Sequence, residues 1–175
     1  VVPDQPPTIE AASDATRTVA GEMRMDYTAR DDYGVTGGSA RIELDLAAVD
    51  RRYGLTVEPE PRDPIEIDLP LPVTGDRREF TQTIAEDFSQ HPWAGLPVKI
   101  ALFDTDAAAQ QGNAPGATIT LPGRRFFDTM SLALIEMRRD LLWNISNGPR
   151  VTQVLRAVSW HPDDVFRQPG VYLKL

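Results

Sequence analysis

Cysteine is absent from the 175 residues of this chain, and histidine is nearly absent. The lack of cysteine excludes disulfides, thiolate metal ligands and a cysteine nucleophile. The two histidines, His91 and His161, are each followed by proline and lack the HExxH spacing of a zinc site. No G-x-S-x-G sequence presents a serine for nucleophilic attack. We therefore predict no catalytic residues, no cofactor and no enzyme activity.

Lysine is also scarce, since Lys99 and Lys174 are the only two and the other sixteen basic residues are arginine. Residues 1–122 carry 21 Asp+Glu against 10 Lys+Arg, a net charge of −11. Residues 123–175 carry 5 against 8, a net charge of +3, which gives the −8 of the whole chain. The acidic first part argues against nucleic acid and anionic lipid surfaces as partners.

Long apolar runs are missing as well. No segment approaches the ~20 apolar residues that span a bilayer, so we expect no membrane insertion by this chain. The chain starts with Val1-Val2-Pro3 and ends at Leu175 in what reads as an interrupted amphipathic helix. We expect it to be a fragment of a longer protein, truncated at its C-terminus.

Fifteen prolines and twelve glycines separate short segments that have the two-residue alternation of β-strands. Residues 40–46 alternate most regularly, and residues 53–57 form a weaker strand signal. Residues 98–103 are a nearly continuous apolar run, which predicts a strand buried on both faces. Pro70 and Pro72 confine the preceding strand to a sheet edge.

Seven or eight such segments recur at roughly the 8–12-residue spacing of a β-sandwich. We therefore predict that residues 1–123 form a mainly β domain, an immunoglobulin-like or cadherin-like antiparallel β-sandwich. The apolar side chains expected in its core, or closing its end, are Ile42, Leu44, Leu46, Trp93, Ile100 and Leu102.

A helical pattern replaces the strands after residue 123. Apolar side chains recur at helical spacing, Asp128 is a candidate N-cap, residues 147–149 (NGP) form a stop, and His161 opens a possible third helix. We predict that residues 124–175 form a small α-helical appendage. Part of its apolar stripe is expected to stay uncovered and to allow self-association. This stripe consists of Met130, Leu134, Met137, Leu141 and Ile145.

Two acidic turns are the only metal-ligating pattern in the chain. Asp31 and Asp32 follow one strand-like run, and Asp104 and Asp106 close another. Calcium prefers six to eight oxygen ligands, so four carboxylates at one end of a sandwich are candidate calcium ligands. Aspartate is also a common turn residue, and no EF-hand loop is present. We expect no metal site and no calcium dependence, and keep calcium as an alternative.

Four motifs occur in a characteristic order: residues 29–35 (ARDDYGV), 91–98 (HPWAGLPV), 121–126 (LPGRRF) and 136–141 (EMRRDL). In these motifs the chain resembles a family of large, uncharacterised alphaproteobacterial inner-membrane proteins. Those proteins carry membrane helices near the N-terminus, a middle region like this one and a long glutamine-rich helical C-terminal part. The resemblance implies an extracytoplasmic module on the periplasmic side of the inner membrane, and it supplies no site residues.

Together these patterns predict a non-enzymatic structural or interaction module of a larger, membrane-anchored bacterial envelope protein. Its expected partners are other parts of the parent chain or other envelope proteins. One alternative is a calcium- or ligand-binding module of the adhesion type. Another is a cryptic hydrolase, since so acidic a chain offers many carboxylate pairs.

Overall fold

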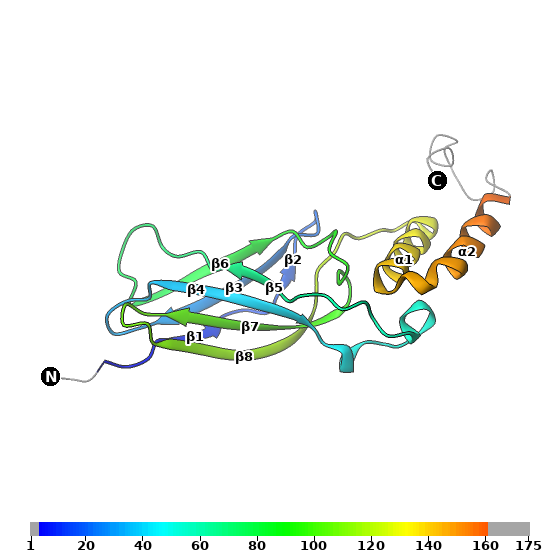
Figure 1. Cartoon of the computed structure of the whole chain (residues 1–175). Coiled ribbons are helices and arrows are strands. Elements are labelled where there is room, and N and C mark those ends of the chain that lie inside the picture. The colour runs from blue at the N-terminus through cyan, green and yellow to red at the C-terminus, as the bar shows by residue number, and fades with distance from the viewer. Residues whose placement is uncertain (1–3, 161–175) are drawn as a thin grey trace. The chain divides into compact units, whose positions relative to one another are not determined.

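The computed structural model describes residues 4–160, which form two compact units. The first unit contains residues 4–49 and 62–125 and consists of β-strands and one short 3-10 helix (Figure 1). The second contains residues 50–61 and 126–160 and consists of helices and one irregular segment. The predicted boundary at residue 123 stays a prediction, and the structure adds that residues 50–61 group with the helices.

The first sheet is built around β3 (Met23–Arg30). Strand β6 (Glu79–Glu86) pairs with it antiparallel over its full length, from Met23 opposite Glu86 to Arg30 opposite Glu79. Strands β1 (Thr8–Ala11) and β2 (Thr16–Arg17) pair antiparallel with successive parts of β3. These two short strands are therefore one edge strand with an interruption, where Ala12 and Ser13 both donate to the carbonyl of Asp26.

The second sheet has the order β5-β4-β7-β8 and is also antiparallel. Its strands are β5 (Ile65–Asp68), β4 (Gly37–Leu44), β7 (Pro97–Thr105) and β8 (Gln111–Thr120). Strand β5 lies at a sheet edge, as its flanking prolines predicted. The pairing of β7 with β8 is irregular between Ile100 and Leu102, next to Pro115 on the edge strand β8.

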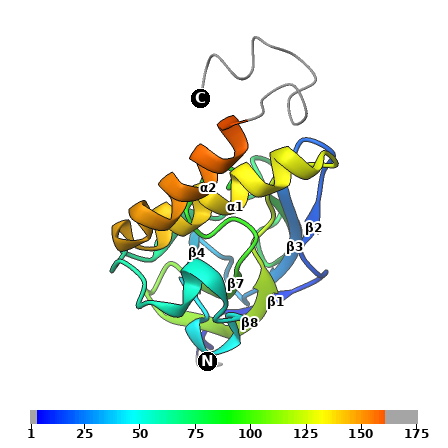
Figure 2. The same ribbon diagram turned by 90° about the vertical axis from the view of Figure 1, so that its right-hand side faces the viewer.

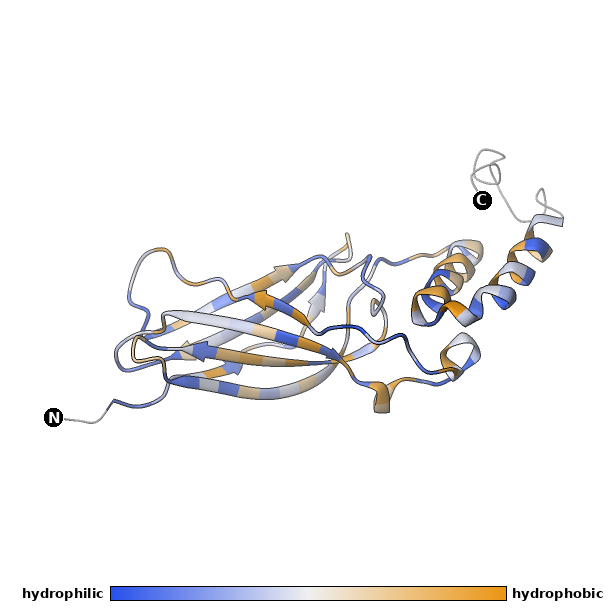
Figure 3. Ribbon diagram, viewed as in Figure 1, coloured by the Kyte–Doolittle hydropathy of each residue, from blue (hydrophilic) through white to orange (hydrophobic). Residues whose placement is uncertain are grey.

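Hydrophobic and hydrophilic residues alternate along several strands (Figure 3), and the apolar side chains of the inward rows fill the space between the two sheets. The mainly antiparallel β prediction is confirmed, and the inward rows are buried. They include Met23, Met25, Tyr27 and Ala29 on β3, Ala40 and Ile42 on β4, Phe80 and Ile84 on β6, and Val98, Ile100 and Leu102 on β7. Each fully buried large apolar side chain contributes about 1.5–3 kcal/mol, so these rows hold the two sheets together.

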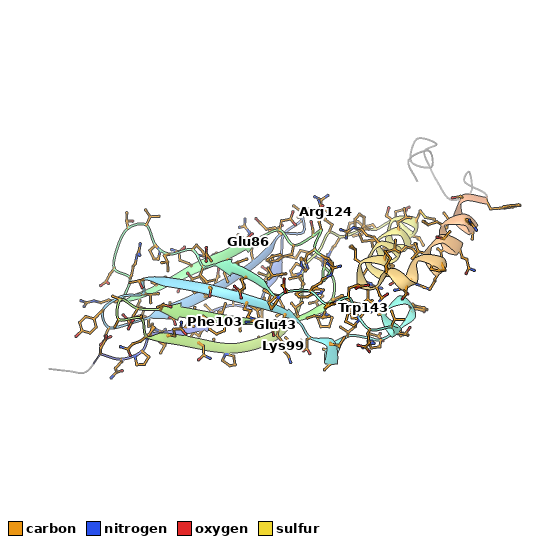
Figure 4. All side chains as sticks on the ribbon, in the orientation of Figure 1. Glu43, Glu86, Lys99, Phe103, Arg124 and Trp143 are labelled. Carbon is orange, nitrogen blue, oxygen red and sulfur yellow. The ribbon has the colours of Figure 1, made fainter. Side chains whose placement is uncertain are left out.

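Two sequence-based strand interpretations are wrong. Strand β7 buries only one face, because Lys99 and Phe103 on its other row are not buried (Figure 4). The alternation of residues 40–46 stops at Leu44, which is half-buried, while Leu46 is 37% exposed in a short 3-10 helix, η1 (Leu46–Ala48). The reason is that Asp45 turns inward there and hydrogen-bonds to Thr118.

The second unit contains α1 (Thr129–Trp143), the 3-10 helix η3 (Ile145–Asn147) and α2 (Gly148–Trp160), with α1 and α2 in contact (Figure 2). Asp128 caps α1 as predicted, since its carboxylate accepts from the amides of Met130 and Ser131. No helix among residues 4–160 has the length and apolar character that crossing a membrane requires.

Other expectations for this region are wrong. Residues 147–149 do not stop a helix; α1 ends before Asn144, and Gly148 begins α2. The predicted strand near residue 55 is a 3-10 helix, η2 (Tyr53–Thr56). The apolar stripe, in contrast, is partly uncovered as expected, since only Met137 is buried and Ile145 is 78% exposed. The proposed helix start at His161 lies outside the described residues.

Candidate functional site

Three aspartates meet at one end of the two-sheet unit. Asp31 follows β3, and Asp104 and Asp106 flank Thr105, the last residue of β7. Strand β4 begins opposite the end of β7, so the loop after β3 and the turn after β7 lie side by side. Thr36 ties them together: its amide donates to the Thr105 carbonyl at 2.8 Å, and its hydroxyl donates to the Asp106 carbonyl at 2.8 Å. We call Asp31, Asp104 and Asp106 the acidic end.

All three carboxylates are buried. Asp31, Asp104 and Asp106 are 8%, 1% and 4% exposed. On β7 the inward row runs through Ile100 and Leu102 and continues to Asp104. A carboxylate therefore occupies a position where the strand pattern calls for an apolar side chain.

Local turns satisfy only two of these six oxygens. Oδ2 of Asp31 accepts from the amides of Tyr33 at 3.1 Å and Gly34 at 2.6 Å. Gly34 has φ of +110°, a conformation that favours glycine, and this brings its amide to the carboxylate. Oδ1 of Asp106 accepts from the amide of Gln110 at 2.7 Å. The four remaining oxygens, Oδ1 of Asp31, both of Asp104 and Oδ2 of Asp106, are buried and have no hydrogen-bond partner in the described residues.

The buried charges act on one another. The pKa of Asp104 is raised to about 6, mainly by burial and also by the charges of Asp31 and Asp106, while hydrogen bonds from the backbone amides of Asp104 and Gly112 oppose the increase. Burial, followed by the charge of Asp104, also raises the pKa of the Tyr27 phenol to about 12. Tyr27 donates its hydroxyl hydrogen to the carbonyl of Pro70. The ion pairs found in the described residues involve none of the three carboxylates of the acidic end.

Two further carboxylates lie at the rim. Asp32, predicted together with Asp31, is exposed and does not join the buried group. The pKa of Asp4 is raised by partial desolvation, by a hydrogen bond with Asp32 and by the charges of Asp32 and Asp106. Sequence reasoning missed Asp4, because the sequence of the proline-rich N-terminal segment does not show that this segment runs past the acidic end.

Gly112 on β8 makes room for this arrangement. A Cβ atom there would collide with the carbonyl oxygen of Pro7 and with Oδ1 of Asp104. Those two oxygens therefore approach the same point of the backbone. A hollow lined by Pro6, Pro7, Thr8, Ile9, Gln111, Gly112 and Asn113 opens on the surface at this place.

A buried aspartate at the opposite end of the same unit is satisfied by protein groups. Asp45 accepts from the Thr118 hydroxyl at 2.8 Å, and Lys99 Nζ lies 3.6 Å away. The hydrogen bond from Thr118, followed by the charge of Lys99, lowers the pKa of Asp45. In the described residues no side-chain hydroxyl or cation plays this part at the acidic end, where the donors are backbone amides. As they stand, the His, Asp and Glu side chains of residues 4–160 form no group of three or more that could hold a metal ion.

A family model described as a domain of unknown function, DUF4175, matches residues 1–175. The chain belongs to the DUF4175 family. No curated protein gives a significant match. The family assignment confirms the expected resemblance to an uncharacterised family, and it assigns no catalytic or binding residue.

Elsewhere in this DUF4175 chain, His91 and Trp93 lie in the segment that joins β6 to β7. His91 Nδ1 accepts from the Trp93 amide at 3.1 Å, and the two rings meet edge to face with centroids 5.0 Å apart. Burial, followed by the charge of Arg62, lowers the pKa of His91. Trp93 is buried, as predicted for a side chain that closes the core.

The second unit has its own buried aspartate, which sequence reasoning missed. Asp140 is 1% exposed and pairs with Arg150. Asn147 Nδ2 donates to the carbonyls of Asp140 at 2.8 Å and Gly54 at 2.9 Å. Trp143 (Figure 4) donates its indole hydrogen to the Val57 carbonyl at 2.8 Å. These bonds attach residues 50–61 to the helices, which indicates a structural role.

Proposed function

We propose that this DUF4175 domain is a non-enzymatic, immunoglobulin-like module that serves a structural or interaction role in a larger membrane-anchored envelope protein. The strand pairing is the observation that carries the proposal. In immunoglobulin domains strands A, B and E share one sheet, and C′, C, F and G share the other. Taking β1 as A, β3 as B and β6 as E reproduces the first sheet, and β5-β4-β7-β8 reproduces C′-C-F-G.

The chemistry of the gathered side chains supports a non-catalytic role. The acidic end contains carboxylates and a tyrosine, whereas His91 lies at the opposite end and is held by Trp93. General acid–base catalysis by two carboxylates needs one to be protonated and both to reach a substrate, but these three are buried. A cryptic hydrolase would release product from chromogenic ester, phosphate or glycoside substrates, and Asp104→Asn would abolish that release. Such a result would contradict the proposal.

The predicted periplasmic placement can be tested because the chain has no native cysteine. In the full-length parent, with any other cysteines replaced, Val73→Cys introduces a thiol at an exposed position of the first unit. We expect a membrane-impermeant maleimide to label it in cells whose outer membrane is permeabilised. Ala40→Cys, at a fully buried position, is the matched control and should react only after denaturation. Labelling of Val73→Cys only after lysis would place the module in the cytoplasm.

Partners are proposed to be other parts of the parent chain, other envelope proteins or a second copy. The exposed side chains of Leu141, Ile145 and Trp160 in the helical unit support self-association. Light scattering at increasing protein concentration tests this. We expect masses above the monomer that fall with Ile145→Asp, and a strict monomer at all concentrations would contradict self-association.

A second candidate function, a calcium- or ligand-binding module of the adhesion type, is favoured by one specific observation. This observation is the set of unpartnered carboxylate oxygens at the acidic end.

A further inference from the structure

Burying a carboxylate without a partner is costly, because the group loses its hydration and gains nothing in return. In the acidic end both oxygens of Asp104 lack a hydrogen-bond partner, and Asp31 and Asp106 each leave one oxygen unpartnered, which makes four buried oxygens. A proton on one carboxylate, an ordered water that donates to the free oxygens, or a cation among them can relieve this cost without rebuilding the fold. Of these, only a divalent cation offsets the charge of more than one carboxylate. We propose that the acidic end binds a divalent cation, with Asp31, Asp104 and Asp106 as its carboxylate ligands, and that calcium is the preferred ion.

The donor set determines the class of metal. All candidate ligands are hard oxygens, and neither histidine nor cysteine takes part, which favours calcium or magnesium over zinc. The Pro7 carbonyl oxygen approaches Asp104 beside Gly112 and can add a main-chain ligand. Asp4 and Asp32 at the rim add negative potential that attracts cations. Calcium accepts six to eight ligands in flexible geometry, whereas magnesium requires a strict octahedron, so a site on two loops favours calcium.

The side chains are partly arranged for this role. Asp31 and Asp106 each hold one oxygen in a turn hydrogen bond and leave the second unpartnered. The carboxylates do not yet form a group that could hold a metal, so the proposal requires them to move together around the ion. Thr36 links the two loops and limits the movement required.

Asp45 shows how this fold satisfies a buried carboxylate with its own groups. Thr118 and Lys99 supply a hydrogen bond and a positive charge there. This contrast between the two ends of one unit indicates that the positive charge at the acidic end comes from an external cation. It also supplies a matched control, Asp45→Asn, for the experiment below.

The test uses residues 1–175 at neutral pH, first with EDTA and then with calcium or magnesium in millimolar excess. Thermal unfolding gives Tm, and terbium titration, followed by luminescence sensitised by Tyr27, gives an independent affinity. We expect calcium to raise Tm by roughly 5 °C or more, with a smaller effect of magnesium. Asp104→Asn and Asp106→Asn should each weaken terbium and calcium binding by at least about tenfold, because charge count sets affinity. Asp45→Asn should keep the response of the wild type.

Several results would overturn the proposal. One is an unchanged Tm in millimolar calcium, and another is an equal calcium response in the wild type and in Asp104→Asn. A third is a Tm that rises on acidification toward pH 5 but does not change with calcium at neutral pH. This result would show that protonation alone relieves the cost of burying the carboxylates. Asp104→Asn removes a buried repulsive charge, so it should fold in EDTA, and its Tm there verifies this. The inference deepens the second candidate function, and its failure would leave the labelling test of Val73→Cys unaffected.

Discussion

Asp104→Asn should stabilise the protein in the absence of divalent cations, although it removes a native side chain from the interior. Burial together with Asp31 and Asp106 raises the pKa of Asp104 from 3.8 to about 6. Each tenfold change in proton affinity corresponds to about 1.4 kcal/mol. The ionised carboxylate therefore costs up to about 3 kcal/mol of folding free energy at pH 8. Screening by water at the rim reduces this, so we expect a gain of about 1–3 kcal/mol.

The dependence on pH distinguishes this electrostatic effect from a change in packing, which would alter stability equally at every pH. Because the pKa is raised in the folded state, the unfolded chain releases its proton first as the pH increases. The stability linked to Asp104 is fully present below about pH 4 and is lost as the pH rises through about 6. The asparagine variant lacks this loss. The difference between variant and wild type should therefore grow from pH 4 to pH 7 and then remain constant.

Urea denaturation in EDTA at a series of pH values measures this difference directly. Wild type and variant share every other side chain, so the difference between them reports the removal of the Asp104 carboxylate. A variant that is less stable than the wild type at pH 8, or a difference that does not change with pH, would refute the reasoning. Either result would mean that the carboxylate has protein partners that the described structure does not contain.

Two further predictions concern packing. Gly54→Ala should destabilise the helical unit by at least about 2 kcal/mol in urea denaturation, because a Cβ atom would collide with Asp140; Gly148→Ala is the control, since no atom lies within 4 Å of its Cβ position. Equal stability of the two variants would contradict this. Ile42→Ala should cost about 2–5 kcal/mol, whereas Leu46→Ala should cost less than about 1 kcal/mol because its side chain is 37% exposed. A loss for Leu46→Ala as large as that for Ile42→Ala would contradict the assignment of Leu46 to the exposed side.

The sequence predicted the sheets well where strands alternate. Strands β3 and β4 follow their pattern because one face of each is buried, and the edge position of β5 follows from its prolines. Strand β8 lacks a clear alternation in the sequence, because Gly112, Pro115 and Gly116 interrupt this edge strand. There, pairing with β7 overrides local propensity.

Polar burial was the part that sequence could not reveal. Asp45, Asp104 and Asp140 all appear as ordinary turn or surface residues in the sequence, yet each is buried. Their burial depends on partners far along the chain, such as Thr118 for Asp45. The proximity of Asp31 to Asp106 could not be predicted, because a single sequence does not show which strand ends lie side by side. Thr36 and the pairing of β4 with β7 supply that information.

The most direct test of the cation proposal is a crystal structure of this domain soaked with terbium, with an anomalous difference map calculated from the data. The account predicts one strong peak among Asp31, Asp104 and Asp106, with carboxylate oxygens at about 2.3–2.6 Å, the range of calcium–oxygen bonds. Asp104→Asn crystals should lose that peak. Peaks confined to exposed carboxylates, or a wild-type acidic end without a peak, would contradict the account.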